Sequence, residues 1–162
     1  MAAWKRPREL GITNIVKLAS NENPHGTSPL AAAVITDVLA GLARYPDGSG
    51  HSLKQALSER LGVSMEQITL GNGSNDVLDL VVRAFVDPGQ PVVVAEYAFA
   101  VYALATQSVN GQLIVVPAQD FGHDLEAMAT AVTDLTRVVF IANPNNPTGT
   151  YRDSDSVERG LN

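Results

Sequence analysis

The feature that most constrains the fold is a pair of short, uninterrupted apolar runs, Pro91–Ala95 (PVVVA) and Arg137–Ala142 (RVVFIA). Runs of this length are typical of strands that are buried on both faces of a parallel sheet. Between them the pattern predicts, in chain order, a helix at 98–107, a strand at Gln112–Val116 and a helix capped by Asp124 over Leu125–Val132. Alternation at this spacing indicates an α/β domain with a mostly parallel sheet.

The residues before the first apolar run carry helix signals. Residues 1–27 are rich in Pro, Asn and Gly and are interpreted as an extended arm. A helix is expected from Pro29, because proline suits the first helical position and apolar residues follow at helical spacing. That spacing involves Leu30, Val34, Val38 and Leu42, and the helix is expected to break at Tyr45–Gly48.

A second group of elements is expected between residues 52 and 89. Ser52 and Gln55 fit a capping box at the start of a helix. Ile68–Leu70 is expected to form a short strand, followed by a helix that Ser74 or Asn75 caps and that runs to about Phe85.

Composition excludes several classes of protein. Hydrophobic residues make up 45% of the 162 residues and charged residues 17%, which is typical of a globular domain. The formal net charge of −6 argues against a nucleic-acid or anionic-membrane partner. Cysteine is absent and the three histidines are scattered, so no metal site is expected. No apolar run approaches the roughly 20 residues that span a bilayer, and a cytoplasmic location is expected.

The first motif that could carry chemistry is Gly71–Asp76 (GNGSND), between a predicted strand and a predicted helix. Glycines allow a tight turn and a close approach to a ligand, and a helix start offers free N–H groups beside the Ser74 hydroxyl. These features suit the phosphate of a small ligand. A plain turn with Ser74 or Asn75 as the helix cap explains the same residues equally well.

The second motif is Asn143–Gly149 (NPNNPTG), directly after the last predicted strand. Two prolines make this loop rigid, and it follows the carboxyl end of a strand, where open α/β sheets bind their ligands. Its asparagines supply neutral hydrogen-bonding groups. We favour a ligand site over an ordinary proline-rich exit turn.

In this order and spacing, GNGSND, YAFAVY (residues 97–102) and NPNNPTG resemble fold-type-I pyridoxal-phosphate-dependent aminotransferases. VKLASNENPHG (Val16–Gly26) and RYPDG (Arg44–Gly48) resemble the histidinol-phosphate branch of that family. The resemblance covers about Val16 to Thr150. It implies the three-layer α/β fold of the cofactor-binding large domain, with a mostly parallel sheet that is incomplete at the C-terminus of this chain.

The resemblance also implies roles for individual residues toward pyridoxal phosphate. Ser74 and Asn75 would hold the cofactor phosphate, Phe99 would stack on the pyridine ring, and Asn146 would hydrogen-bond the phenolic oxygen. Tyr97 and Tyr102 are neighbours of Phe99, and for Tyr102 a place in the core is at least as good an interpretation. One X-Pro bond of the Asn143–Gly149 loop is expected to be cis, again from the family.

Further roles that the resemblance implies lie in the first 50 residues. Tyr45 would reach the phosphate of the neighbouring subunit in a homodimer, with a turn tyrosine packed on a helix as the competing interpretation. Glu22 and Asn23 would contact the substrate, because the arm covers it in the family.

The implied reaction transfers an amino group between histidinol phosphate and 2-oxoglutarate or glutamate, in histidine biosynthesis. This chemistry needs a lysine that forms a Schiff base with the cofactor. Lys5, Lys17 and Lys54 are the lysines of the chain, and none follows a strand in the expected context. No catalytic residue is therefore assigned, and the chain alone is expected to be inactive.

Residues 1–27 are thus interpreted as an arm, 28–150 as the first part of the large domain, and 151–162 as a divergent polar tail without an apolar stripe. Two alternatives remain open. The chain could come from another enzyme of this fold, such as an aromatic aminotransferase or a threonine-phosphate decarboxylase, or it could be a non-catalytic truncated fragment.

Overall fold

A computed structural model describes residue 11 and residues 21–161 of the chain. The chain divides into two compact units, Met1–Gly50 and His51–Asn162, and each is described by itself. In the described residues, no helix is long and apolar enough to cross a membrane.

The described part of the first unit centres on one helix. α2 (Pro29–Val38) begins with proline, as expected, and passes into the 3-10 helix η2 (Leu39–Gly41). The expected break follows, where Asp47 Oδ1 accepts a hydrogen bond from Ser49 N–H at 2.9 Å. Every residue from 21 to 49 is exposed, including the apolar side chains of α2.

The second unit begins with α3 (His51–Leu61) and the 3-10 helix η3 (Met65–Gln67). The predicted capping box at Ser52 and Gln55 is wrong, because α3 begins at His51 and Ser52 lies inside its first turn. A capping arrangement occurs instead at Ser64, whose N–H donates to Gln67 Oε1 at 2.9 Å.

The strand predicted at Ile68–Leu70 is also absent. The backbone at Ile68 is extended, with φ of −112° and ψ of 119°. In the described residues, however, no neighbouring strand pairs with this segment, so it remains a connection. It leads into α4 (Ser74–Phe85), which has the predicted length.

The sheet contains β1 (Pro91–Ala95), β2 (Gln112–Val116) and β3 (Val138–Val139) in the order β2-β1-β3. Both pairings are parallel, with Val93 aligned to Ile114 and to Val139. β3 is shorter than the predicted Arg137–Ala142, although Phe140 N–H still donates to Val93 O at 3.0 Å. The chain leaves β1 after that bond, and pairing ends.

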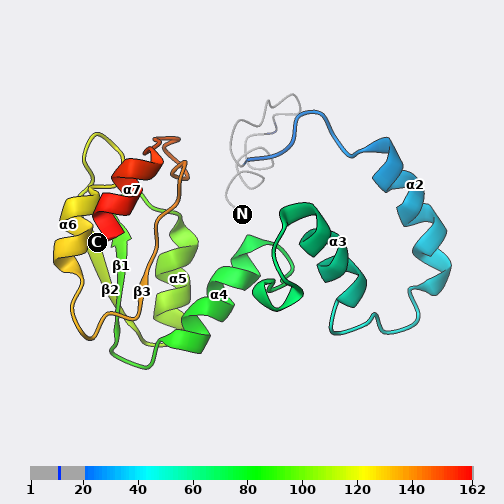
Figure 1. The fold of residues 1–162 in the computed structure, drawn as a ribbon, viewed down its shortest axis with the longest axis horizontal. Coiled ribbons are helices and arrows are strands. Elements are labelled where there is room, and N and C mark those ends of the chain that lie inside the picture. The colour runs from blue at the N-terminus through cyan, green and yellow to red at the C-terminus, as the bar shows by residue number, and fades with distance from the viewer. Residues whose placement is uncertain (1–10, 12–20, 162) are drawn as a thin grey trace. The chain divides into compact units, whose positions relative to one another are not determined.

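Helices cover both faces of this sheet, as Figure 1 shows. On one face, α4 and α5 (Ala100–Ser108) pack against β1, and Val82, Val92, Val94 and Tyr102 belong to one buried cluster. On the other face, α6 (Leu125–Ala131) contributes Met128 to a second cluster. Alternate residues of β1 therefore enter opposite clusters. The expected three-layer α/β fold with a parallel sheet is confirmed.

The tail differs from its prediction. Residues Ser154–Leu161 form a helix, α7, that contacts α6 (Figure 1). Asp153 starts it, since the Asp153 carboxylate accepts from Ser156 N–H at 2.8 Å. Ser156 and Val157 are partly buried. The segment consists mostly of polar and charged residues, so its composition did not indicate a helix.

Candidate functional site

The start of α4 forms a tight, glycine-dependent turn. Gly73 has a φ of 91° and is the residue before the helix, so Ser74 is the first helical residue and neither Ser74 nor Asn75 is the cap. A Cβ at Gly71 would lie 2.9 Å from Val77 Cγ2. The turn therefore brings the backbone close to the helix in a way that only glycine permits.

Some polar groups of this turn are hydrogen-bonded to each other, and others are exposed to solvent. Asn72 donates through its N–H and its Nδ2 to Asp76 Oδ2, at 3.0 and 3.2 Å. The Ser74 and Asn75 side chains are exposed and, among the described residues, make no hydrogen bond. The first N–H groups of a helix lack partners within the helix and attract anions. This turn can therefore bind a phosphate, although the Asp76 carboxylate reduces the attraction.

The aromatic segment after β1 lies on the same face of the sheet as α4. Phe99 directly precedes α5, is partly buried, and packs against the cluster that also contains Leu78 of α4. Its ring meets that of Tyr102 edge-on, with centroids 6.0 Å apart. Phe99 thus keeps part of its surface available for a ligand.

Tyr102 has a different environment. It is 7% exposed and stacks on Phe140 with ring centroids 4.3 Å apart. Burial raises the pKa of its hydroxyl above 10.0, because the protein interior disfavours the phenolate. The interpretation of Tyr102 as a core residue is therefore the one that the structure supports.

The Asn143–Gly149 loop follows β3, and both of its X-Pro bonds, Asn143–Pro144 and Asn146–Pro147, are cis. One cis bond was expected. Asn146 is partly buried, and its side chain makes no hydrogen bond within the described chain. Its amide is thus available to a ligand.

Asn145, which the sequence did not single out, is the most constrained residue of this loop. It is 3% exposed, and its Nδ2 donates to Tyr97 O at 3.0 Å and to Thr148 Oγ1 at 2.8 Å. Asn145 Oδ1 is buried and has no hydrogen-bond partner among the residues that the structure describes. The only available signal was its place beside Asn146 in the motif.

A second set of polar contacts holds the loop on its other side. Asn143 Nδ2 donates to Arg152 O at 2.7 Å, and Asn143 Oδ1 accepts from Arg152 N–H at 2.9 Å. The Arg152 guanidinium donates through Nη2 to His123 O at 3.0 Å. His123 is 3% exposed, and its Nε2 lies 2.9 Å from Ala142 O. A lone histidine in the sequence carries no sign of such burial.

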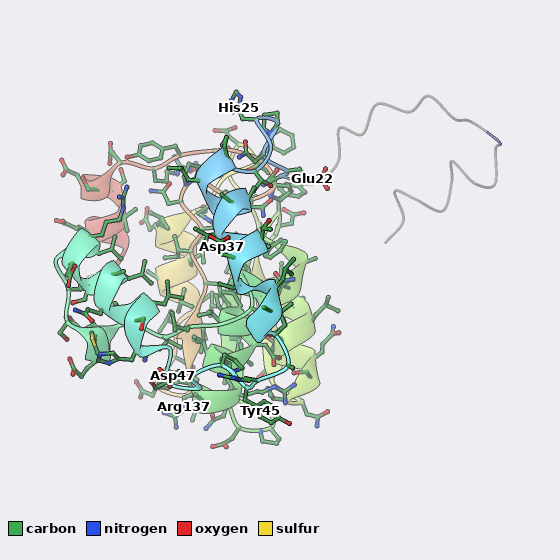
Figure 2. All side chains as sticks on the ribbon, turned by 90° about the vertical axis from the view of Figure 1, so that its right-hand side faces the viewer. Glu22, His25, Asp37, Tyr45, Asp47 and Arg137 are labelled. Carbon is green, nitrogen blue, oxygen red and sulfur yellow. The ribbon has the colours of Figure 1, made fainter. Side chains whose placement is uncertain are left out.

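The remaining predicted residues belong to the first unit, as Figure 2 illustrates for Glu22 and Tyr45. Tyr45 is fully exposed, and Glu22 and Asn23 are exposed as well. Asn23 is engaged in its own turn, where Oδ1 accepts from His25 N–H and Nδ2 donates to Gly26 O, both at 3.0 Å. Ser74, Phe99 and Asn146 belong to the other unit, His51–Asn162.

Lys54 is the lysine that lies within the described residues. It is partly buried on α3, and its charge is the smallest of three influences that lower the pKa of Glu66. The larger two are hydrogen bonds to the Glu66 carboxylate from its own backbone and from Ser64. Lys5 and Lys17 fall outside the described residues.

Comparison with known proteins defines the class. The family model for aminotransferase class I and II matches residues 13–159. The chain belongs to this family.

Individual members of this family that are similar to the chain include histidinol-phosphate aminotransferases. The chain is 59% identical to histidinol-phosphate aminotransferase 2 of Pseudomonas fluorescens and 60% identical to histidinol-phosphate aminotransferase 1 of Thiobacillus denitrificans, over 95% of this chain in both cases. It spans 42% and 41% of the length of these relatives. The crystal structure of a histidinol-phosphate aminotransferase from Sinorhizobium meliloti, in complex with pyridoxal-5′-phosphate, superposes with a TM-score of 0.89 at 30% identity. That match covers 96% of this chain and 42% of the other.

Proposed function

We propose that this chain forms the first part of a pyridoxal-phosphate-dependent aminotransferase that acts on histidinol phosphate, with 2-oxoglutarate and glutamate as the amino-group partners. The family match and the names of the relatives at 59% and 60% identity support this reaction. The role in histidine biosynthesis, a cytoplasmic location and a homodimer belong to the same proposal.

The observation that carries the proposal is the convergence of three segments in the second unit. Leu78 of α4 and Phe99, directly before α5, pack against the same buried cluster, and α4 contacts α5. The Asn143–Gly149 loop joins the same segment through the hydrogen bond from Asn145 Nδ2 to Tyr97 O. The glycine turn and Phe99 thus precede two helices that contact each other, and the loop of Asn146 is bonded to the segment that carries Phe99.

These residues fit pyridoxal phosphate. Ser74 and Asn75 would hold the phosphate through the N–H groups at the start of α4 and the Ser74 hydroxyl. Phe99 would cover one face of the pyridine ring and keep water from it. Asn146 would donate from Nδ2 to the phenolic oxygen. When bound, the cofactor supplies an electron sink for reaction at the substrate carbon.

The proposal also gives roles to three residues of the first unit. Tyr45 would reach the cofactor phosphate of the neighbouring subunit, and its full exposure leaves the hydroxyl available for this contact. Glu22 and Asn23 would contact the substrate. The Asn23 amide would first have to leave its turn, because both of its polar atoms are engaged there.

The Schiff-base lysine is not assigned to any lysine of this chain. Lys54 lies on α3, away from the segments that carry Ser74, Phe99 and Asn146 in sequence, and is not preceded by a strand. We therefore expect the chain alone, mixed with pyridoxal phosphate and glutamate, to show no turnover. A reducible adduct on one specific lysine together with turnover would contradict this expectation.

Grafting tests the proposed reaction. Residues 13–159 of this chain would replace the matching segment of the Pseudomonas fluorescens relative, and the purified graft would be assayed for glutamate formation from histidinol phosphate and 2-oxoglutarate. We expect turnover. A folded, cofactor-loaded graft that prefers an aromatic amino acid, or decarboxylates threonine phosphate, would overturn the substrate assignment.

Two variants of the graft test the role of Asn146. Asn146→Ala removes the proposed hydrogen bond to the cofactor, and we expect kcat/KM to fall by about tenfold or more. The matched control is Gln107→Ala, which removes an exposed amide from α5. Equal activity of the two variants would show that Asn146 has no such role.

A further inference from the structure

Asn145 is an unusual residue to bury in a loop. Its side chain is almost inaccessible, yet within the described part of the chain only the amide nitrogen has hydrogen-bond partners and Oδ1 has none. A buried acceptor without a partner destabilises a fold. An aliphatic side chain would avoid this cost, but it could not donate a hydrogen bond.

The acceptors around Asn145 define the orientation of its amide. Tyr97 O is a carbonyl oxygen and can only accept, so the atom that faces it at 3.0 Å must be Nδ2. The same nitrogen donates to Thr148 Oγ1 at 2.8 Å. Exchanging the oxygen and nitrogen of the amide would bring two acceptors together at Tyr97.

The two hydrogen bonds of Nδ2 differ in the sequence separation of their partners. The bond to Thr148 lies within the loop, where Asn145 N–H also donates to Thr150 O at 2.8 Å and Gly149 N–H donates to Asn145 O at 2.7 Å. The bond to Tyr97 spans 48 residues and joins the loop after β3 to the segment after β1. Backbone bonds therefore already shape the loop, and the Tyr97 bond adds a connection between segments.

This connection lies next to the two residues assigned to the cofactor ring. Tyr97 is two residues before Phe99, and Asn145 directly precedes Asn146. Ala98 N–H donates to Ala95 O at 3.2 Å and Tyr102 N–H to Phe99 O at 3.0 Å, so two successive hydrogen-bonded turns, residues 95–98 and 99–102, join β1 to α5. Tyr97 lies in the first turn and Phe99 opens the second, so a shift at Tyr97 would reach Phe99 through the backbone that joins the turns.

We propose that Asn145 is a positioning residue: its Nδ2–Tyr97 hydrogen bond sets the spacing between Phe99 and Asn146, and thereby the width of the slot for the pyridine ring. The proposal rests on the proposed function for the identity of the ring. It predicts a loss of ring binding without a loss of phosphate binding when the bond is removed.

The test uses the 162-residue chain and two variants that keep the branching of the side chains they replace. Asn145→Leu keeps the branch point at Cγ and removes both hydrogen bonds of Nδ2. Thr148→Val keeps the shape of Thr148 and removes the loop-internal acceptor, but leaves the bond to Tyr97. Amide hydrogen exchange is measured at Ala98 and Tyr102, with Val93 and Val94 of β1 as references for global opening.

We expect Asn145→Leu to exchange about fivefold or more faster than wild type at Ala98 and Tyr102, with β1 unchanged, and Thr148→Val to exchange as wild type does. Equal acceleration of the β1 amides would assign Asn145 a general structural role and overturn the proposal. Wild-type exchange at Ala98 and Tyr102 in Asn145→Leu would overturn it too.

Binding completes the test. The probe is 4-deoxypyridoxine 5′-phosphate, which carries the ring and phosphate but no aldehyde to react with lysines, with inorganic phosphate as the comparison. We expect Asn145→Leu to weaken probe binding by about fivefold or more and to leave phosphate binding unchanged. Unchanged probe binding overturns the positioning role. If the wild type does not bind the probe, the proposed cofactor role of this chain fails, whereas hydrogen exchange still decides whether Asn145 couples the two segments.

Discussion

The two units of this chain use apolar residues differently. In the unit His51–Asn162, Val82, Val92 and Val93 have no exposed surface, because helices cover both faces of the sheet. In the unit Met1–Gly50, α2 carries apolar residues at helical spacing, but Leu30 is 81% exposed and Val34 59% exposed. The apolar pattern of β1 and that of α2 each predicted the observed secondary structure. Only the apolar side chains of β1 are buried in a core.

This difference shows what an amphipathic sequence pattern can and cannot predict. Spacing predicts that a segment is helical and which side of it is apolar. It does not identify the surface that covers this side. The second unit holds its own partners within the chain, since α4, α5 and α6 follow or precede the strands they cover. For α2, no described residue of its own unit buries the apolar side.

The largest expected effect comes from removing buried volume. Met128 on α6 is 1% exposed, so Met128→Ala should lower the free energy of unfolding by about 2–5 kcal/mol. Val34→Ala on α2 should change it by less than about 0.5 kcal/mol. Urea unfolding followed by circular dichroism measures both, and similar losses for the two variants would remove the contrast between the units.

A smaller effect is expected at the helix caps. Asp124 Oδ1 accepts from Ala127 N–H at 3.0 Å at the start of α6, so Asp124→Ala should cost about 1 kcal/mol. Ser28 precedes α2 without a side-chain hydrogen bond, and Ser28→Ala should leave stability unchanged. If Ser28→Ala proved the more damaging substitution, the cap assignments of the two units would be wrong.

The smallest effect concerns pH. Burial raises the pKa of Tyr102 above 10.0 in the folded chain, while the unfolded chain keeps the ordinary value. Below that value both states are protonated and stability does not depend on Tyr102. As the pH rises above it, the unfolded state loses its proton first, so stability falls until the folded value is passed.

The replacement Tyr102→Phe should remove this part of the fall. The free energy of unfolding is measured from about pH 8 to about pH 11 in both proteins, and the slopes of free energy against pH are compared. Identical slopes would show that Tyr102 is not shielded as the structure indicates.

Much of the second unit could be predicted from the sequence, because its strands are continuous apolar runs and the start of α6 carries a clear cap. Asp124 and the run Pro91–Ala95 are examples that the structure confirms. The strand predicted at Ile68–Leu70 is wrong because a strand needs a neighbour as well as a suitable composition. The helix α7 was missed because its segment consists mostly of polar and charged residues.

For the candidate site, the motifs indicated Ser74, Phe99 and Asn146, but not Asn145, which joins the segment of Phe99 to the loop of Asn146. Asn145 is hydrogen-bonded to Tyr97 O, 48 residues away, and the sequence around Asn145 does not indicate so distant a partner. Tyr45, Glu22 and Asn23 rest on the family resemblance, and their roles remain predictions.

The central claim is that the second unit carries the first part of a cofactor site and that α2 does not. A titration of the isotope-labelled 162-residue chain with 4-deoxypyridoxine 5′-phosphate, followed by amide chemical shifts, tests it most directly. We expect saturable shifts at Gly73–Asp76, Phe99 and Asn146, with none over Pro29–Val38. Saturable shifts confined to other residues, or none at all in a folded sample, would contradict the account.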